Sequence, residues 1–160
     1  AQCKKFTDIN LKDKDLQRTV WDDTKISEVN FNGADLEKSS FFQSNITEST
    51  FVGARLKKAV IEDAIIEYCN FKKADLSKSN LGKSSFEKVM FDDADLSGVN
   101  FSDSKIYKVS FVNANLERST LRSCTFCTKH AAVFLGELPE AKQISAVGFA
   151  KINSIICSAR

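Results

Sequence analysis

The residues whose spacing best fits known chemistry are Cys124 and Cys127, which form a Cys-x-x-Cys motif three residues before His130. This spacing is typical of redox dithiols and of zinc sites, because thiolate and imidazole groups are preferred zinc ligands. His130 is the only histidine, so a Ser-His-Asp or Cys-His arrangement has no support beyond the presence of the residue types. The sequence also contains no glycine-rich phosphate loop. We therefore expect a protein that is not an enzyme, with no catalytic residue, cofactor or metal.

The segment that leads up to these residues has a period of five. Every fifth residue from Phe6 to Phe126 is apolar, which makes 25 consecutive positions in a chain that is 42% hydrophobic. From Thr24 onward, a small residue stands two places before each of them. A period of five fits neither the 3.6 residues of a helical turn nor the alternation of a strand. Each pentad is therefore expected to be a short extended piece followed by a corner.

A second period, of twenty residues, is superimposed on the first. It predicts a structural core made of a column of Phe and a column of Leu: Phe31, Phe51, Phe71, Phe91, Phe111, Leu36, Leu56, Leu76, Leu96 and Leu116. Residues twenty apart should lie over one another at the ~4.8 Å spacing of neighbouring strands. Four pentads then form the four sides of one coil, and about six coils give a rod roughly 29 Å long.

Segments such as Ala34-Asp35-Leu36 and Ala114-Asn115-Leu116 resemble the A(D/N)LXX signature of the pentapeptide-repeat family, and the resemblance covers residues 4–128. The resemblance implies an all-β solenoid, a right-handed quadrilateral β-helix with the central Phe or Leu and the preceding small residue inside. The first coil departs from this pattern, because Lys4, Ile9 and Lys14 occupy its small-residue positions. We expect that coil to be partly open or capped.

The C-terminal part of the chain breaks the repeat, so we divide the protein into a β-helix over residues 1–128 and a helical cap over residues 129–160. Apolar residues such as Ile144, Val147 and Ile152 recur there at helical spacing after Pro139. A solenoid must cover its last coil, because exposed sheet edges invite association. The alternative is a homodimer formed through this end, as the resemblance implies for some family members. Since the only Met is Met90, we also expect a trimmed chain or a piece of a longer protein.

The repeat changes the interpretation of the cysteines. Cys124 stands at an inward small-residue position, whereas Cys127 follows the inward Phe126, so the two thiols should point to opposite sides of the wall. Cys69 also stands at an inward position. Five cysteines do not make a full disulfide framework. The sequence shows neither a secretory signal nor a membrane span, and we expect a cytoplasmic protein.

Charge identifies no partner by itself, because 23 basic residues nearly balance 21 acidic residues without a basic block. We expect no direct binding of nucleic acid. On the Leu wall, a column with Asp15, Asp35, Asp75 and Asp95 runs beside a basic column, which would relieve its like-charge repulsion. The next wall is the most acidic, and it carries Asp22, Asp23, Glu62, Asp63 and Asp103 against Lys83 and Arg122.

This acidic wall bears on one activity that the family resemblance implies, the inhibition or protection of DNA gyrase or topoisomerase by a rod that mimics DNA. A mimic of duplex phosphates should carry a dense negative field. The outward positions here are nearly neutral, with interleaved lysines. DNA mimicry is therefore our alternative hypothesis.

Apolar residues at outward positions support the leading hypothesis. The repeat places Phe42, Ile65, Tyr68 and Tyr107 on two adjoining walls of the surface. Single exposed apolar residues are common on soluble proteins, but clustered aromatic residues are typical of protein interfaces. We therefore predict a protein–protein interaction rod or scaffold that binds a protein partner, with these four residues in its contact surface.

Overall fold

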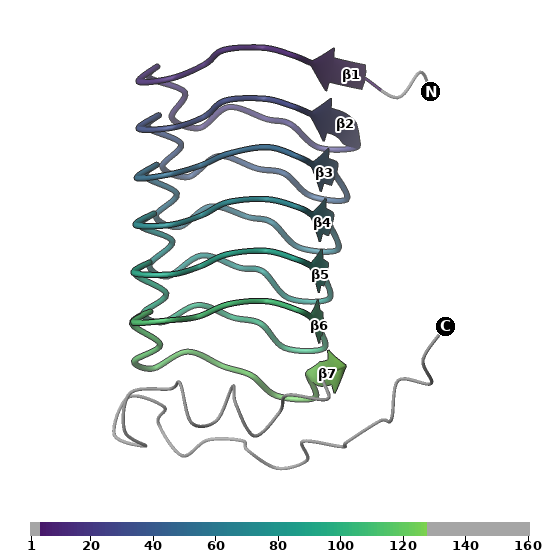
Figure 1. Cartoon of the computed structure of the whole chain (residues 1–160), viewed down its shortest axis with the longest axis vertical. Helices are drawn as coiled ribbons and strands as arrows, with labels where there is room; N and C mark the ends of the chain where they lie inside the picture. The colour runs from purple at the N-terminus through teal and green to yellow at the C-terminus, as the bar shows by residue number, and fades with distance from the viewer. Residues whose placement is uncertain (1–3, 128–160) are drawn as a thin grey trace.

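The computed structural model describes the backbone of residues 4–127 and the side chains of residues 4–125. Its strands form one parallel sheet in sequence order, and each residue pairs with the residue twenty positions later, as Phe6 does with Ile26. Figure 1 shows these strands stacked along one side of the rod. The strands are β1 (Lys4–Thr7), β2 (Thr24–Ser27), β3 (Asn45–Thr47), β4 (Ile65–Glu67), β5 (Ser85–Glu87), β6 (Lys105–Tyr107) and β7 (Thr125–Cys127).

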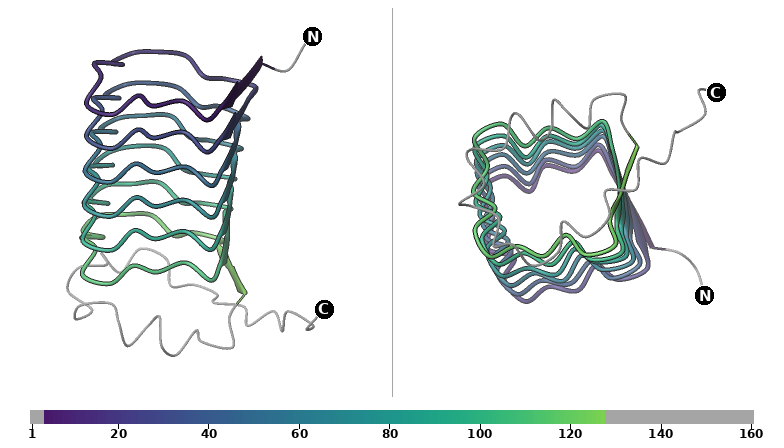
Figure 2. Two further views of the ribbon diagram at one scale, coloured as in Figure 1. Left: turned by 45° about the horizontal axis from the view of Figure 1, so that its top comes forward. Right: turned by 90° about the horizontal axis from the view of Figure 1, so that it is seen from below.

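The other three walls are joined by isolated parallel bridges with the same twenty-residue offset. One example from each wall is Asn10↔Asn30, Asp15↔Asp35 and Val20↔Ser40. The view along the rod in Figure 2 shows the resulting four-sided cross-section. The fold is thus an all-β quadrilateral solenoid with twenty residues per coil, as the sequence predicts. The expected cap at 129–160 lies outside the described residues.

Each corner of the rod is made by one residue in the left-handed backbone region. The corner residue comes two positions after each inward residue. In the described range, 21 non-glycine residues and three glycines have a positive φ, and all of them stand at this position. Asp8 (φ 54°) and Lys58 (φ 59°) are examples, and Gly53 (φ 65°) is one of the glycines that adopt this conformation without steric cost. The corner amide still donates to the next coil, as Lys58 N does to Ser77 O at 3.0 Å. Every wall can therefore turn without losing its backbone hydrogen bonds.

The interior contains the Phe and Leu columns that the sequence predicts, together with mixed apolar columns from the other two walls, to which Ile46 and Phe101 belong. The Phe rings lie nearly face to face, with centroids 4.7 Å apart between Phe31 and Phe51 and 4.4 Å apart between Phe51 and Phe71. The Leu column from Leu36 to Leu116 is fully buried. Some serines at the small-residue positions satisfy their hydroxyls locally, as Ser39 Oγ does by donating to Leu36 O at 2.7 Å, whereas the hydroxyls of Ser79 and Ser119 have no partner. A polar residue can therefore occupy this narrow core.

The first coil differs from the coils that follow. Phe6, Leu11, Leu16 and Trp21 are only half-buried, whereas the equivalent residues from Ile26 onward are buried in nearly every coil. Lys4 and Lys14 are exposed at the positions that small buried residues occupy in later coils. The first coil is thus partly open, as its sequence predicts. Within the part of the chain described, no helix is long and apolar enough to cross a membrane.

Candidate functional site

The two thiols that the structure describes are interior groups. Cys69 and Cys124 are free and buried. Burial raises the pKa of the Cys69 thiol to about 12 and that of Cys124 to about 11. Both thiols face backbone carbonyl oxygens, Cys69 Sγ at 3.2 Å from Glu67 O and Cys124 Sγ at 2.9 Å from Phe101 O. They are therefore protonated at neutral pH and are poor nucleophiles and poor metal ligands.

The partners of Cys124 in the Cys-x-x-Cys-His pattern are not placed, because His130 and the side chain of Cys127 lie outside the described residues. In the range that is described, no group of three His, Cys, Asp or Glu residues could hold a metal ion.

The acidic column of the Leu wall is largely engaged in structural contacts. Asp35, Asp75 and Asp95 each accept a hydrogen bond from the backbone amide two residues later, at 2.9–3.1 Å. No ion pair among the described residues joins this column to the neighbouring basic column. Instead Arg55, which stands in the acidic column itself, contacts Asp35 at 2.9 Å and Glu37 at 3.5 Å. Arg55 thus offsets the charge of Asp35 from within the acidic column.

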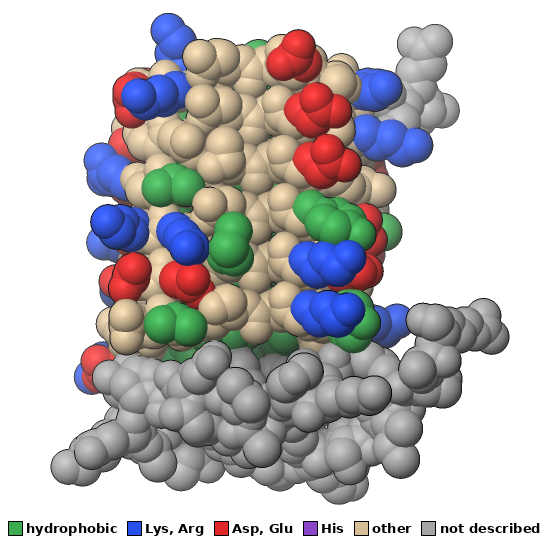
Figure 3. Space-filling view, in the orientation of Figure 1, with side chains coloured by type: hydrophobic (Ala, Val, Ile, Leu, Met, Phe, Trp, Pro, Cys, Tyr) green, Lys and Arg blue, Asp and Glu red, His purple; other side chains and the backbone are tan. Residues whose placement is uncertain are grey.

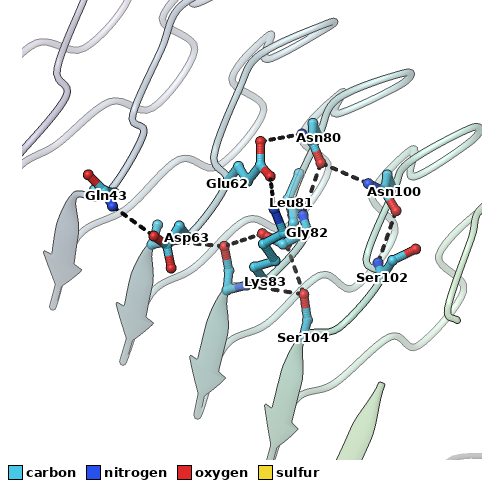
Figure 4. A network of polar contacts seen from close by, with 12 residues as sticks. Gln43, Glu62, Asp63, Asn80, Leu81, Gly82, Lys83, Asn100, Ser102 and Ser104 are labelled. Atoms are coloured by element: carbon cyan, nitrogen blue, oxygen red, sulfur yellow. Dashed lines mark hydrogen bonds and ion pairs between the residues drawn. The ribbon is translucent and has the colours of Figure 1, made fainter. Parts of the chain in front are cut away.

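Carboxylates of the acidic wall, among them Glu62 and Asp63, accept hydrogen bonds from neighbouring side chains of the rod, as Figure 4 shows. Glu62 accepts hydrogen bonds from Asn80 Nδ2 and from Lys83 Nζ, each at 3.0 Å. The hydrogen bond to Glu62 raises the pKa of Lys83. Asp63 accepts from Gln43 Nε2 at 2.8 Å. On the same wall, Asp22 accepts from the Phe42 amide at 2.9 Å and from the Ser40 hydroxyl.

The four candidate contact residues occupy two adjoining walls. Ile65 begins β4, Tyr68 follows β4 at the corner, and Tyr107 ends β6 two coils further along. Phe42 stands on the wall that precedes β3. The side chains of Phe42, Ile65 and Tyr68 are 36%, 44% and 50% exposed, whereas Tyr107 is half-buried. The structure thus places Ile65, Tyr68 and Tyr107 on the strand wall and its corner, with Tyr107 two coils from the other two, and leaves Phe42 around the corner.

Other outward apolar residues lie on the wall that follows the strands and on the wall that carries Phe42. Val112 is 39% exposed and Val52 is half-buried on the wall that follows the strands. Val20, which is 69% exposed, and Met90 were not singled out by the sequence analysis. Both stand one position before an inward residue, so the same repeat would have identified them.

Lysines cover part of the tyrosine surface. Lys88 Nζ lies 3.1 Å from Tyr68 Oη and 4.6 Å from the centroid of its ring. Lys108 Nζ lies 4.9 Å from the centroid of Tyr107. The hydrogen bond from Lys88 to Tyr68 raises the pKa of this lysine. A cation held against an aromatic face gives the surface a mixed apolar and basic character. The sequence contained one indication of this contact: Lys88 stands twenty residues after Tyr68, so it lies in the next coil of the same column.

The chain is similar to solved structures of pentapeptide repeat proteins and of related repeat proteins. One from the Arabidopsis thaliana thylakoid lumen is 14% identical, with a TM-score of 0.32 and coverage of 84% of this chain and 83% of that chain. HetL, involved in heterocyst differentiation regulation in the cyanobacterium Nostoc sp. strain PCC 7120, is 18% identical, with a TM-score of 0.30 and coverage of 75% and 81%. QnrB1, a plasmid-mediated fluoroquinolone resistance protein, is 14% identical, with a TM-score of 0.34 and coverage of 78% of each chain.

No curated protein matches the sequence. Family models do match, and they cover most of the chain. The model described as pentapeptide repeats (8 copies) matches residues 5–43, 25–63 and 39–77, and the model described as a pentapeptide repeat region matches residues 64–142. The chain therefore belongs to the pentapeptide repeat family.

Proposed function

We propose that this chain is a non-enzymatic protein–protein interaction rod, with a contact surface that contains Phe42, Ile65, Tyr68 and Tyr107. The observation that carries the proposal is the exposure of Ile65 and Tyr68 on the wall that also carries Tyr107, two coils further along. Aromatic residues with large contact areas dominate the energetics of protein interfaces. A wall on which they are already exposed favours binding of a partner protein.

The rigidity of the scaffold supports the same function. Ile65 pairs in register with Asn45 on one side and with Ser85 on the other, so its backbone is held by both neighbouring coils. Lys88 holds the Tyr68 ring from the next coil. Groups that are ordered before binding lose less conformational entropy when a partner docks. The surface therefore suits recognition without a large structural change.

DNA mimicry is the second candidate, and the acidic wall is the observation in its favour. Glu62 is already neutralised by Lys83, and Asp63 and Asp22 accept hydrogen bonds from neighbouring coils. The ion pair with Lys83 weakens the negative field that a gyrase-binding mimic needs, whereas Asp22 and Asp63 keep their charge. An assay of supercoiling by purified gyrase tests this candidate. Dose-dependent inhibition that charge reversal at Asp22, Asp23, Glu62 and Asp63 relieves would favour mimicry over our proposal.

The test of the proposed function is affinity capture from source-cell lysate with the full chain, read by mass spectrometry. The double variant F42S/Y107S removes two outward aromatic residues. V112S is the matched control, because Val112 occupies the same place in its pentad on a different wall. We expect a captured protein that is lost with F42S/Y107S and retained with V112S. Identical capture by the wild type and the double variant would contradict the proposal.

A further inference from the structure

The corner that follows the strand wall carries a charge pattern that the proposed function does not use. The outward residues at this corner, in order along the rod, are Asp8, Glu28, Glu48, Tyr68, Lys88 and Lys108. All six are exposed and have positive φ. We call this set the ridge. Figure 3 shows acidic, then hydrophobic, then basic side chains following one another down the right-hand part of the visible face.

The acidic half of the ridge has no partner of its own. Asp8, Glu28 and Glu48 form no hydrogen bond through their carboxylates and no ion pair with any residue in the described range. The strand spacing places neighbouring members of the ridge ~4.8 Å apart, so like charges repel along it. The basic half has contacts within the rod, since Lys88 contacts Tyr68 and forms an ion pair with Glu87 at 3.9 Å, and Lys108 lies over Tyr107. The ridge is therefore an electrostatic dipole along the rod.

This dipole is self-complementary about Tyr68. Glu48 and Lys88 lie one coil away from Tyr68 in opposite directions, and Glu28 and Lys108 lie two coils away. A two-fold axis perpendicular to the rod at Tyr68 would exchange the members of each pair between two copies. The rise per coil is identical in both copies, so Glu48 would meet Lys88 and Glu28 would meet Lys108 at the same level. Parallel rods would instead place acid against acid and base against base.

We propose that a second copy of this chain docks antiparallel along the ridge, with Glu48 and Glu28 of one copy facing Lys88 and Lys108 of the other. The adjoining column on the next wall supports this, because its members carry no charge: Asn10, Asn30, Thr50, Asn70, Met90 and Ser110. The inference deepens the proposed function and rests on it in one respect, because Tyr68 belongs to both surfaces. Here the partner is a second copy of this chain.

The dimer should be weak and sensitive to salt. Its ion pairs would be exposed, and exposed pairs contribute little individually and are screened by salt. A contact one ridge wide also falls below the area of a stable interface. We therefore expect association at low ionic strength and dissociation at high ionic strength.

Sedimentation velocity of the full chain, over a concentration series at about 20 mM and about 500 mM salt, tests the proposal. E28K/E48K makes the ridge basic, and K88E/K108E makes it acidic. Each double variant should remain monomeric alone, whereas an equimolar mixture should form a heterodimer. The fourfold exchange E28K/E48K/K88E/K108E reverses the dipole and should restore the wild-type dimer. Glu and Lys both occur at this corner with similar φ, so the variants should fold, which thermal melting would check.

Three results would overturn the proposal: a wild-type chain that stays monomeric at low salt, a dimer that the double variants leave intact, or a folded fourfold variant that stays monomeric. Lysate capture separates this proposal from the proposed function. A monomeric wild type that still captures a Phe42-dependent protein would overturn only the second-copy proposal. A charge-dependent dimer with capture that F42S/Y107S leaves unchanged would support the dimer and contradict the proposed function.

Discussion

Two interior columns, one of Phe and one of Leu, repeat one residue type in coil after coil, whereas the ridge changes from acid to tyrosine to base along the same axis. Phe51, Phe71 and Phe91 stack in consecutive coils with ring centroids 4.4 and 5.2 Å apart. At the ridge, Glu48 is followed twenty residues later by Tyr68 and then by Lys88. Uniform interior residues satisfy a packing requirement that is identical in each coil. The changing outward residues are not needed for that packing, and they are where we place recognition.

Breaking the interior should have the largest effect on stability. Phe71→Ala should leave a cavity between Phe51 and Phe91 and lower the free energy of unfolding by about 3–5 kcal/mol. Phe6→Ala in the partly open first coil should cost less, about 1–2 kcal/mol, because Phe6 is only half-buried. Chemical denaturation of both variants beside the wild type measures the difference. Equal losses would contradict the contrast between first and middle coils.

Two buried serines in one interior column differ in their hydrogen bonds. Ser39 donates to Leu36 O, whereas the hydroxyl of Ser79 in the same column has no hydrogen-bond partner in the structure. Ser39→Ala should therefore destabilise the rod by about 1 kcal/mol, and Ser79→Ala should be neutral or stabilising. Thermal melts of the two variants provide the measurement. A larger loss from Ser79→Ala than from Ser39→Ala would refute this assignment of the hydrogen bonds.

Alkaline pH tests the burial of Cys69. Its pKa is raised from 9.0 to about 12 in the folded chain, so the folded state holds the proton more tightly than the unfolded state. Its contribution is fully present below pH 9 and is lost as the pH rises toward 12. The loss should be about 1 kcal/mol at pH 10.

The matched variant for this test is Cys69→Ser, because Ser49 occupies the same column one coil earlier. We expect the unfolding free energy of the wild type to fall more steeply between pH 8 and pH 10 than that of the variant. Parallel pH profiles would show that Cys69 is not responsible.

The smallest expected effect concerns a corner outside the ridge. Lys58 has φ 59° and stands between Lys38 and Lys78 in a basic column. Lys58→Gly should relieve both the left-handed backbone strain and the like-charge repulsion, and it should stabilise the rod by about 0.5 kcal/mol. Gly53, which already occupies a corner, provides the matched reverse change Gly53→Lys. If Lys58→Gly lowers the melting temperature, the corner conformation costs less than we infer.

Much of the fold could be predicted from the sequence, because the twenty-residue period appears directly as columns of Phe and Leu. The open first coil was also predictable, since Lys4 and Lys14 cannot occupy a narrow apolar interior. Long outward side chains were harder to predict. The periodicity indicates that Arg55 and Lys88 face outward, but it does not show that Arg55 bridges two carboxylates or that Lys88 covers Tyr68. Such contacts depend on side-chain torsions that the repeat does not constrain.

The candidate surface shows the same limit. The period identified Phe42, Ile65, Tyr68 and Tyr107 as outward residues, but Tyr107 is half-buried, with Lys108 over its ring. The twenty-residue period also identifies the residues of the ridge as one column. It does not show which of their carboxylates lack partners within the rod, and the dimer proposal depends on that. The expected cap at 129–160 and its alternative, a dimer-forming end, lie beyond the described range.

The most direct test of the central claim is parallel lysate capture with the wild type, F42S/Y107S and V112S, each shown by thermal melting to retain the fold. We expect that one captured protein disappears with F42S/Y107S and remains with V112S. Capture that is the same with all three chains would contradict the claim that the outward aromatic residues of the rod carry the function.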